Sequence, residues 1–251
     1  KSWPDFTWDA KELAGKLADV RHRQGRLLGR MEGLGFDLRR EASLNTLTSD
    51  VVKSSAIEGE TLNPDEVRSS IARRLGLEIA GLVPASRHVE GIVEMMLDAT
   101  QRFDSPLTEK RLFGWHAALF PTGFSGPYTI EVGCYRTGEM QIVSGAMGKE
   151  KVHYEAVKPK FVKAEMKKFI TWFNKDNSLD PVLKAAIAHF WFIIIHPFDD
   201  GNGRMARALT DMVLARAEGS GERFYSMSSQ ILEERKMYYT VLQKVQHSKN
   251  D

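Results

Sequence analysis

The segment FWFIIIHPFDDGNGRMARAL, residues 190–209, decides how this sequence is interpreted. Its first half completes an apolar helix predicted over 181–195, with Asp180 as the N-cap, and Pro197 stops that helix because proline cannot continue the backbone hydrogen bonding. A tight loop follows, and the triplet GNG opens a second helix, predicted over 203–217. A helix N-terminus presents unpaired N–H groups, and glycines let a phosphate approach them. The segment therefore predicts an anion site between two helices.

Four side chains around this loop suit nucleotide chemistry. Arg204 and Arg207 share one face of the first helical turn and can both reach a polyphosphate. Asp200 is an oxygen ligand of the kind that Mg2+ takes together with phosphate oxygens and waters. His196 lies across the loop, and its ordinary pKa of about 6.5 suits a general base near neutral pH. Each feature also has a structural reading: a histidine after an apolar helix, a glycine turn, and an ion pair of Arg207 with Asp211.

The string HPFDDGNGRMAR, residues 196–207, resembles the Fic-family motif His-Pro-Phe-any-Asp/Glu-Gly-Asn-Gly-Arg-any-any-Arg at every specified position. The resemblance implies an enzyme that transfers AMP from ATP to a protein hydroxyl, with Mg2+. It also implies that Phe198 anchors the loop, and it leaves His189 as structural. The implied site residues are His196 as base, Asp200 for Mg2+, Asn202 with the Gly201 and Gly203 amides on the α-phosphate, and Arg204 and Arg207 on the β- and γ-phosphates.

Apolar residues at helical spacing dominate the rest of the chain. Between 121 and 159 the pattern changes, and two β-like runs, MQIV (140–143) and VHYE (152–155), predict one isolated hairpin. Further helices are expected over 8–31, 64–75, 86–103, 108–120, 159–174 and 229–246. With the resemblance, this predicts an all-α Fic fold: an N-terminal helical domain over 1–82, then a catalytic core over 83–251 with a β-hairpin flap at about 133–157.

The hairpin matches the place of the Fic flap, upstream of the motif. An exposed strand edge can accept an extended segment of a target protein, which would bring the target hydroxyl before His196. The alternative is a hairpin that only covers the core.

A second resemblance lies upstream, in SSAIEG, residues 54–59. It matches the inhibitory pattern of many Fic proteins: Ser or Thr, three residues, Glu, then Gly or Asn. Glu58 shares a helical stripe with apolar residues, and Gly59 is the expected helix stop, so the carboxylate stands at the negative end of the helix dipole. Such a carboxylate needs a cationic partner; the resemblance proposes Arg207, with Ser54 assisting. The alternative is a solvent-exposed glutamate at a fraying end.

The run ERKMYYTVLQKVQ, residues 234–246, resembles the Fic helix that borders the adenine. Tyr239 and Gln246 are seven residues apart and share a face, with Tyr238 as the neighbouring candidate. A tyrosine at this spacing is also common in a protein core.

The composition of the chain limits the kinds of partner that it is expected to bind. Thirty-five basic residues against 33 acidic ones give a net charge of +2, too little to indicate direct binding to nucleic acid or to a membrane. No long apolar run or secretory signal is present, and the single cysteine, Cys134, forms no internal disulfide, so a cytoplasmic protein is expected. The missing initiator Met and an end just after a helix indicate a piece of a longer chain.

Three other readings remain open. The same site can transfer a different phosphate-containing group or remove AMP. The chain can instead be an ATP-sensing regulatory module, or the toxin half of a growth-arrest pair, although an internal Glu58 makes a separate antitoxin less necessary. Self-modification and a homodimer are both compatible with the main reading.

Overall fold

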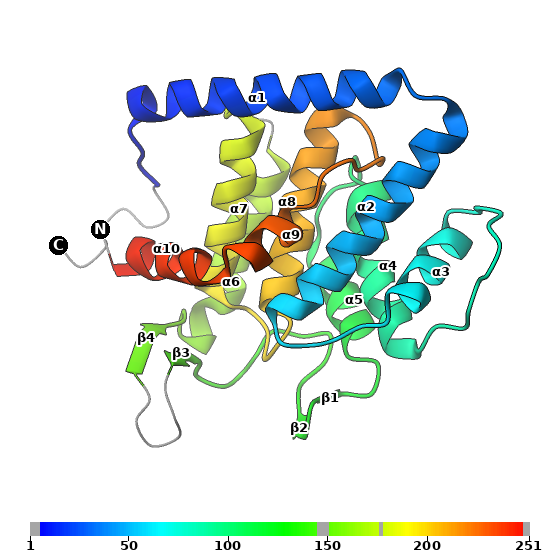
Figure 1. Cartoon of the computed structure of the whole chain (residues 1–251). Helices are drawn as coiled ribbons and strands as arrows, with labels where there is room; N and C mark the ends of the chain where they lie inside the picture. Colours follow the sequence, from blue (N-terminus) through cyan, green and yellow to red (C-terminus); the bar gives the residue numbers. More distant parts are fainter. Residues whose placement is uncertain (1–5, 145–150, 176–177, 248–251) are drawn as a thin grey trace.

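Helices form most of the chain, as predicted. The computed structural model describes residues 6–144, 151–175 and 178–247, without the side chains of 141–155 and 245–247. Figure 1 shows two upright central helices, α7 (Pro181–Ile195) and α8 (Asn202–Glu218), with the other helices around them and two small hairpins at one end.

The two central helices carry the core. Nearly every residue from Asn202 to Ala215 is buried, and most of the second half of α7 is buried as well. Three further helices pack around them: α4 (Arg87–Gln101), α5 (Glu109–Leu119) and α6 (Pro159–Asn174). The loop that joins α7 to α8 is therefore fixed at both of its ends by apolar packing.

Local capping explains where several helices begin. The Asp180 carboxylate accepts a hydrogen bond from the Val182 N–H at the start of α7, and proline takes the first helical position. The Asn63 side chain and Pro64 start α3 (Pro64–Arg74) in the same way. These caps lie where the sequence predicts them.

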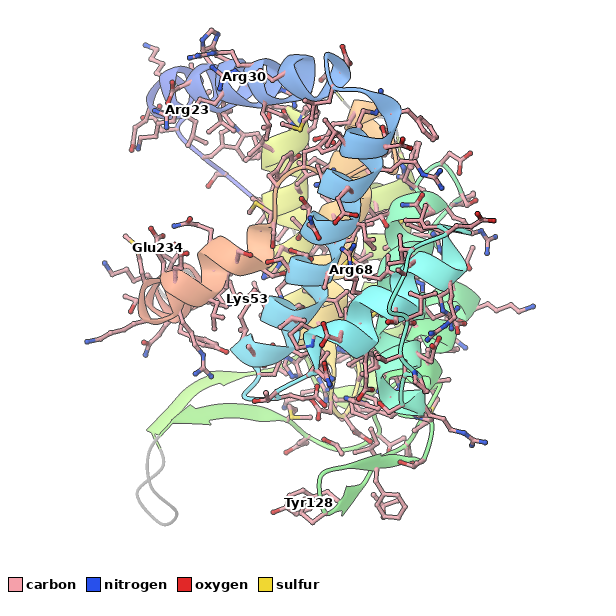
Figure 2. The ribbon with its side chains drawn as sticks, turned by 45° about the vertical axis from the view of Figure 1, so that its right-hand side comes forward. Arg23, Arg30, Lys53, Arg68, Tyr128 and Glu234 are labelled. Carbon is pink, nitrogen blue, oxygen red and sulfur yellow. The ribbon has the colours of Figure 1, made fainter. Side chains whose placement is uncertain are left out.

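The first two helices, α1 (Ala10–Glu32) and α2 (Phe36–Ile57), differ in burial although they have nearly the same length. Helix α1 is described throughout, and none of its residues is buried; Arg23 and Arg30 lie on its outer surface in Figure 2. Helix α2 buries eight residues and packs on α9 (Met227–Glu233) and α3. The C-terminal end of α2 reaches the beginning of α8.

The flap is present as an antiparallel hairpin of β3 (Gln141–Ser144) and β4 (Lys151–Glu155), with an irregularity between Ile142 and Val143. The expectation of one isolated hairpin was incomplete, because β1 (Phe124–Ser125) pairs with β2 (Tyr128–Thr129) in a second one. Strands of two residues show no alternation in the sequence. Both hairpins lie at the end of the molecule where the α7–α8 loop lies (Figure 1).

The single helix predicted over 229–246 was wrong. The structure has α9 (Met227–Glu233) and α10 (Arg235–His247), separated at Glu234, whose φ of −102° is outside the helical range. The break lets α9 pack on α2 while α10 approaches β4. Within the described residues, no helix is both long enough and apolar enough to cross a membrane.

Candidate active site

His196 ends α7 in a strained backbone conformation. Its φ of 50° and ψ of 60° are left-handed, and no other non-glycine residue among those described has a positive φ. Such strain is unusual for a histidine and clusters at functional sites. The ring Nδ1 lies 3.3 Å from the Ile193 carbonyl oxygen, so Nδ1 carries the proton. In the neutral ring, Nε2 is then free to accept a proton.

The surroundings of His196 favour its neutral form. Burial lowers its pKa to about 4; the Ile193 carbonyl opposes this shift, and the Arg136 charge adds to it. A histidine with this pKa is unprotonated at neutral pH and is a weaker base than a free imidazole.

Arg136, which the sequence analysis missed, fixes the backbone at His196. It is 2% exposed, and its Nε donates to the His196 carbonyl oxygen at 2.6 Å. Its other guanidinium nitrogens donate to the carbonyls of Gly138, before β3, and of Val157, after β4. Its backbone N–H donates to the Pro197 carbonyl at 2.9 Å. One buried arginine thus ties both ends of the flap to the α7–α8 loop.

The loop is also closed on itself. The Asn202 side chain accepts from the Phe198 N–H at 3.0 Å and donates to the Phe198 carbonyl at 2.8 Å. Phe198 is fully buried and stacks on the His116 ring, with centroids 4.4 Å apart. Asn202 therefore shapes the loop, whereas the sequence analysis expected its side chain to contact a phosphate.

Asp200 lies at the edge of the cavity. Its Oδ1 accepts from the Gly201 N–H at 2.5 Å, and its Oδ2 accepts from the Ser125 hydroxyl in the β1–β2 hairpin. Among the described residues no group of three or more His, Cys, Asp or Glu side chains is placed to hold a metal. A single carboxylate beside a phosphate site nevertheless fits Mg2+, which takes one or two carboxylates with phosphate oxygens and waters.

Arg207 is engaged by the end of α2. It is 1% exposed; its Nε donates to the Ser54 hydroxyl at 2.8 Å and its Nη2 to the Ser54 carbonyl at 2.9 Å. Nη2 also lies 2.9 Å from Glu58 Oε1. A Cβ built on Gly203 would be only 2.2 Å from that same glutamate oxygen. The Glu58 carboxylate therefore lies directly against the first turn of α8, where an anion is favoured.

The structural alternative for Arg207 does not occur. Asp211 pairs with Arg223 at 3.3 Å, and the two side chains are 4% and 2% exposed. Asp50 of α2 is buried beside Asp211, and one carboxylate oxygen of each has no hydrogen-bond partner within the described part of the chain. Burial, followed by the Asp50 charge, raises the pKa of Asp211 well above its ordinary value.

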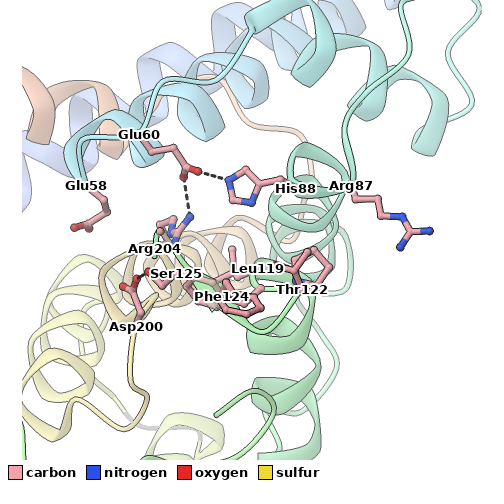
Figure 3. Close-up of a pocket in the computed structure, with 13 residues that line it drawn as sticks. Glu58, Glu60, Arg87, His88, Leu119, Thr122, Phe124, Ser125, Asp200 and Arg204 are labelled. Atoms are coloured by element: carbon pink, nitrogen blue, oxygen red, sulfur yellow. Dashed lines mark hydrogen bonds and ion pairs between the residues drawn. The ribbon is translucent and has the colours of Figure 1, made fainter. Parts of the chain in front are cut away.

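Arg204 lies across the cavity from Glu58. Its Nη1 donates to Glu60 Oε2 at 2.8 Å, and its guanidinium lies 5.2 Å from the centroid of the Phe120 ring. Glu60 also contacts His88 at the start of α4, and Figure 3 shows the glutamate between these two partners. Neither Glu60 nor His88 was expected from the sequence; the only signal was a second glutamate directly after Gly59.

Glu58, Glu60, Asp200 and Arg204 belong to the wall of a cavity of about 600 Å³ (Figure 3). Arg204 Nε, on that wall, is buried and has no hydrogen-bond acceptor within the described residues, and neither has Arg207 Nη1, which lies outside the wall. Unpaired buried donors of this kind are costly unless a ligand completes them. The cavity lining includes Glu58, Glu60, Arg87, His88, Leu119, Phe120, Pro121, Thr122, Phe124, Ser125, Gly126, Asp200 and Arg204.

The three residues expected beside the adenine lie on α10. The Tyr238 hydroxyl forms a hydrogen bond of 2.8 Å with His189 Nε2. His189 Nδ1 forms another, of 3.2 Å, with the Thr210 hydroxyl. Tyr239 is 44% exposed. The Gln246 side chain lies outside the described residues. His189 therefore lies in a hydrogen-bond network that includes one of the candidate tyrosines.

Comparisons with known proteins agree with this geometry. Residues 106–214 match the Fic/DOC family, and residues 1–77 match the domain of unknown function DUF4172. The protein adenylyltransferase fic-1 of Caenorhabditis elegans is 29% identical over 178 residues, which cover 66% of this chain and 31% of that protein. The protein adenylyltransferase Fic of Drosophila grimshawi is 29% identical over 189 residues, 71% of this chain and 35% of that protein. The chain thus spans about a third of these relatives.

Solved structures show the same fold. A Fic family protein from Desulfovibrio desulfuricans aligns with a TM-score of 0.68 and 24% identity, over 100% of this chain and 70% of that one. A Fic-1 segment from Caenorhabditis elegans aligns with a TM-score of 0.61 and 23% identity, over 94% of this chain and 66% of that one. The Fic/DOC match ends in α8 and includes the complete loop from His196 to Arg207. The chain thus carries a Fic/DOC match over residues 106–214, preceded by a DUF4172 match over residues 1–77.

Proposed function

We propose that this protein transfers AMP from ATP to a hydroxyl side chain of a target protein, and that Glu58 restrains the reaction. The observation that carries the proposal is the juxtaposition at the α7–α8 loop. His196, with Nε2 available, directly precedes the loop that opens α8 with its two buried arginines, and the charges of Asp200 and Glu58 both act on its ring. The similarity to proteins named adenylyltransferases supports AMP as the transferred group.

The chemistry follows from these groups. His196 Nε2 accepts the proton of the target hydroxyl as its oxygen forms a bond to the α-phosphorus of ATP. The bond between the α-phosphorus and the bridging oxygen breaks, and pyrophosphate leaves. The Gly203 amide, and the Gly201 amide once it leaves Asp200 Oδ1, stabilise charge on the α-phosphate, while Arg204 and Arg207 bind the departing phosphates after their glutamate contacts have been exchanged.

Asp200 would hold Mg2+, which supplies charge neutralisation on the phosphate oxygens. Asp200→Ala is expected to raise the Mg2+ concentration needed for half-maximal ATP binding by about tenfold or more. Asp199→Ala is the matched control, because the neighbouring Asp199 carboxylate accepts from the Glu131 N–H instead. Identical Mg2+ titrations for Asp200→Ala and the parent would remove Asp200 from the metal site.

Glu58 restrains this site by occupying it. Its carboxylate holds Arg207 and fills the space over Gly203, so the γ-phosphate and Glu58 compete for one guanidinium. Ser54 contributes a further hydroxyl and carbonyl to the same arginine. This arrangement explains why a buried arginine is stable before ATP arrives.

The flap would present the target. The β3–β4 hairpin lies at the same end of the molecule as the catalytic loop and is tied to it through Arg136. An extended target segment added to a flap edge would bring its hydroxyl towards His196. Tyr238, Tyr239 and Gln246 on α10 would border the adenine. A site released from restraint would also meet hydroxyls of its own chain, so self-modification is expected.

The test uses ATP labelled separately at its α- and γ-phosphates, incubated with the Glu58→Gly protein and analysed by mass spectrometry. Retention of the α-label with a mass increase of one AMP supports the proposal. Transfer of the γ-label would indicate a kinase-like reaction, and ATP binding without any transfer would indicate a nucleotide sensor. His196→Ala in the same background controls for non-enzymatic labelling.

A further inference from the structure

Two glutamates leave the end of α2, and each reaches a different arginine of α8. Glu58 Oε1 lies 2.9 Å from Arg207 Nη2, and Glu60 Oε2 lies 2.8 Å from Arg204 Nη1. Both arginines belong to the first turns of α8 and are at most 5% exposed. The second contact involves a residue to which the proposed function assigns no role.

The turn that ends α2 creates this pairing. Gly59 has a φ of 84°, which is easily reached only by glycine. The Gly59 N–H donates to the Ala56 carbonyl at 3.0 Å and the Glu60 N–H to the Ser55 carbonyl at 3.1 Å, the two bonds of a Schellman cap. This cap fixes the backbone on both sides of Gly59, and from it both carboxylates extend towards α8.

Glu60 is held from two sides. One carboxylate oxygen contacts Arg204, and the other contacts His88 Nε2 in the first turn of α4 (Figure 3). Burial opposes ionisation of Glu60, but the His88 hydrogen bond and the Arg204 charge together hold its pKa below its ordinary value. Glu60 is therefore an ionised, oriented partner of Arg204.

Arg204 depends on such a partner. Its side chain lies over the Phe120 ring, and its Nε has no acceptor among the residues described. A buried guanidinium requires a nearby anion, and Glu60 supplies one where it lines the cavity. A phosphate that approaches Arg204 meets a carboxylate already bound to it. Two anions beside one guanidinium repel each other strongly in a partly buried site.

We propose that Glu60 is a second restraining carboxylate, which holds Arg204 in the resting protein and must move away before the β- and γ-phosphates of ATP can bind. His88 is a positioning residue that keeps Glu60 turned towards Arg204. This inference rests on the proposed function, which brings ATP to Arg204. It adds that ATP must displace two carboxylates, Glu58 before Gly59 and Glu60 after it, each from a different arginine.

The test is calorimetry of ATP and AMP binding to the full chain with Mg2+, which requires no transfer. Glu60→Gln keeps the shape of the side chain and removes its charge. We expect it to raise ATP affinity by about 3- to 30-fold, in both the wild-type and the Glu58→Gly background, since a charge-assisted hydrogen bond is lost from the resting state. AMP affinity should stay nearly unchanged, because AMP has no β- or γ-phosphate.

Matched variants separate this effect from general changes. Glu90→Gln removes a carboxylate that pairs with Arg73 and Arg74 away from the cavity, and it should leave ATP affinity unchanged. His88→Ala should raise ATP affinity by less than Glu60→Gln does. His88→Gln, which retains a side-chain N–H donor, should bind ATP with the same affinity as the parent protein. Thermal melting of each variant shows that it is folded.

The outcomes are distinct. If ATP binds and Glu60→Gln leaves its affinity unchanged or lowers it, Glu60 is not a restraint, while the proposed function still stands. If AMP and ATP affinities rise equally, the effect does not act through the terminal phosphates and the inference fails. If no folded variant binds ATP, both the inference and the proposed function fail.

Discussion

The catalytic loop and the end of α2 meet at one cavity, but they are held there in different ways. The loop is fixed by core packing of Phe198, by Asn202 and by Arg136. The end of α2 is held by three residues, Ser54, Glu58 and Glu60, whose side chains bond to the arginines of α8. Packed groups do not rearrange easily, whereas polar contacts at a cavity edge can be exchanged for those of a ligand. Changes in the loop should therefore abolish function, and changes at the end of α2 should increase it.

The largest effect is expected from His196→Ala. Loss of a general base should slow transfer by about 10² to 10⁴ while ATP binding survives, because the imidazole acts on the target hydroxyl. Calorimetry and a transfer assay on one sample measure both quantities. His22→Ala on the exposed face of α1 is the control. Near-normal transfer by His196→Ala would exclude the histidine from the mechanism and remove the difference between the two regions.

Glu58→Gly tests the opposite region. Loss of its charge-assisted bond to Arg207 should raise transfer by about 10- to 150-fold. We expect the lower part of that range, because the Glu58 side chain is 36% exposed and water screens the pair.

Arg207→Ala breaks the same pair but should not activate, since it also removes a phosphate ligand. Transfer rates and self-modification of both variants, measured at equal ATP, check this asymmetry. Unchanged transfer by a folded Glu58→Gly protein would make SSAIEG an ordinary helix end.

A smaller effect is expected at the other meeting of α2 and α8, where Asp50 lies beside Asp211. The raised folded-state pKa of Asp211 means that folding favours its protonated form. The resulting stability is complete below about pH 4 and is lost as pH rises through the folded-state pKa, by at most about 1.4 kcal/mol per pH unit. In the Asp211→Asn variant, the melting temperature should fall less steeply as pH rises. Asp19→Asn on α1 is the control and should show the same fall as the parent protein. An unchanged slope in Asp211→Asn would contradict the raised pKa of Asp211.

The smallest effect is the absence of a pH dependence. With a pKa of about 4, His196 stays neutral, so the rate should be flat from about pH 7 down to pH 5.5. A histidine with a pKa of 6.5 would lose about eightfold in its neutral fraction between pH 7 and pH 5.5. Transfer rates of Glu58→Gly at saturating ATP measure this, and a fall of about eightfold by pH 5.5 would show that burial does not shift this group.

Local signals in the sequence were sufficient for much of the fold. The bounds of α6 and α7 match the prediction because Pro159, Asp180 and Pro181 define their starts within a few residues. The break at Glu234 could not be predicted, since it depends on where α9 meets α2 and α10 meets the flap. The β1–β2 hairpin was missed because its strands are two residues long.

The candidate site also contains residues that the sequence indicated and residues that it could not indicate. The motif brought His196, Asp200, Arg204 and Arg207 to one loop, and the stripe correctly predicted buried Leu44, Leu47, Val51 and Ser54, whereas Glu58 caps α2 and is 36% exposed. The contacts of Arg136 and Glu60 depend on partners about 60 and 144 positions away. No periodicity or capping signal reports such pairs. The role of Asn202 also needed the loop conformation, because only there do its two amide atoms meet Phe198.

The Glu58 carboxylate against Gly203 has a consequence for how the proposed restraint responds to nucleotide. Because this inhibitor is part of the chain, its effective concentration at Arg207 is set by the geometry of α2 and does not change on dilution. ATP, in contrast, competes in proportion to its concentration in the surroundings. The balance between resting and nucleotide-bound protein would therefore follow the ATP concentration alone, at any abundance of the protein.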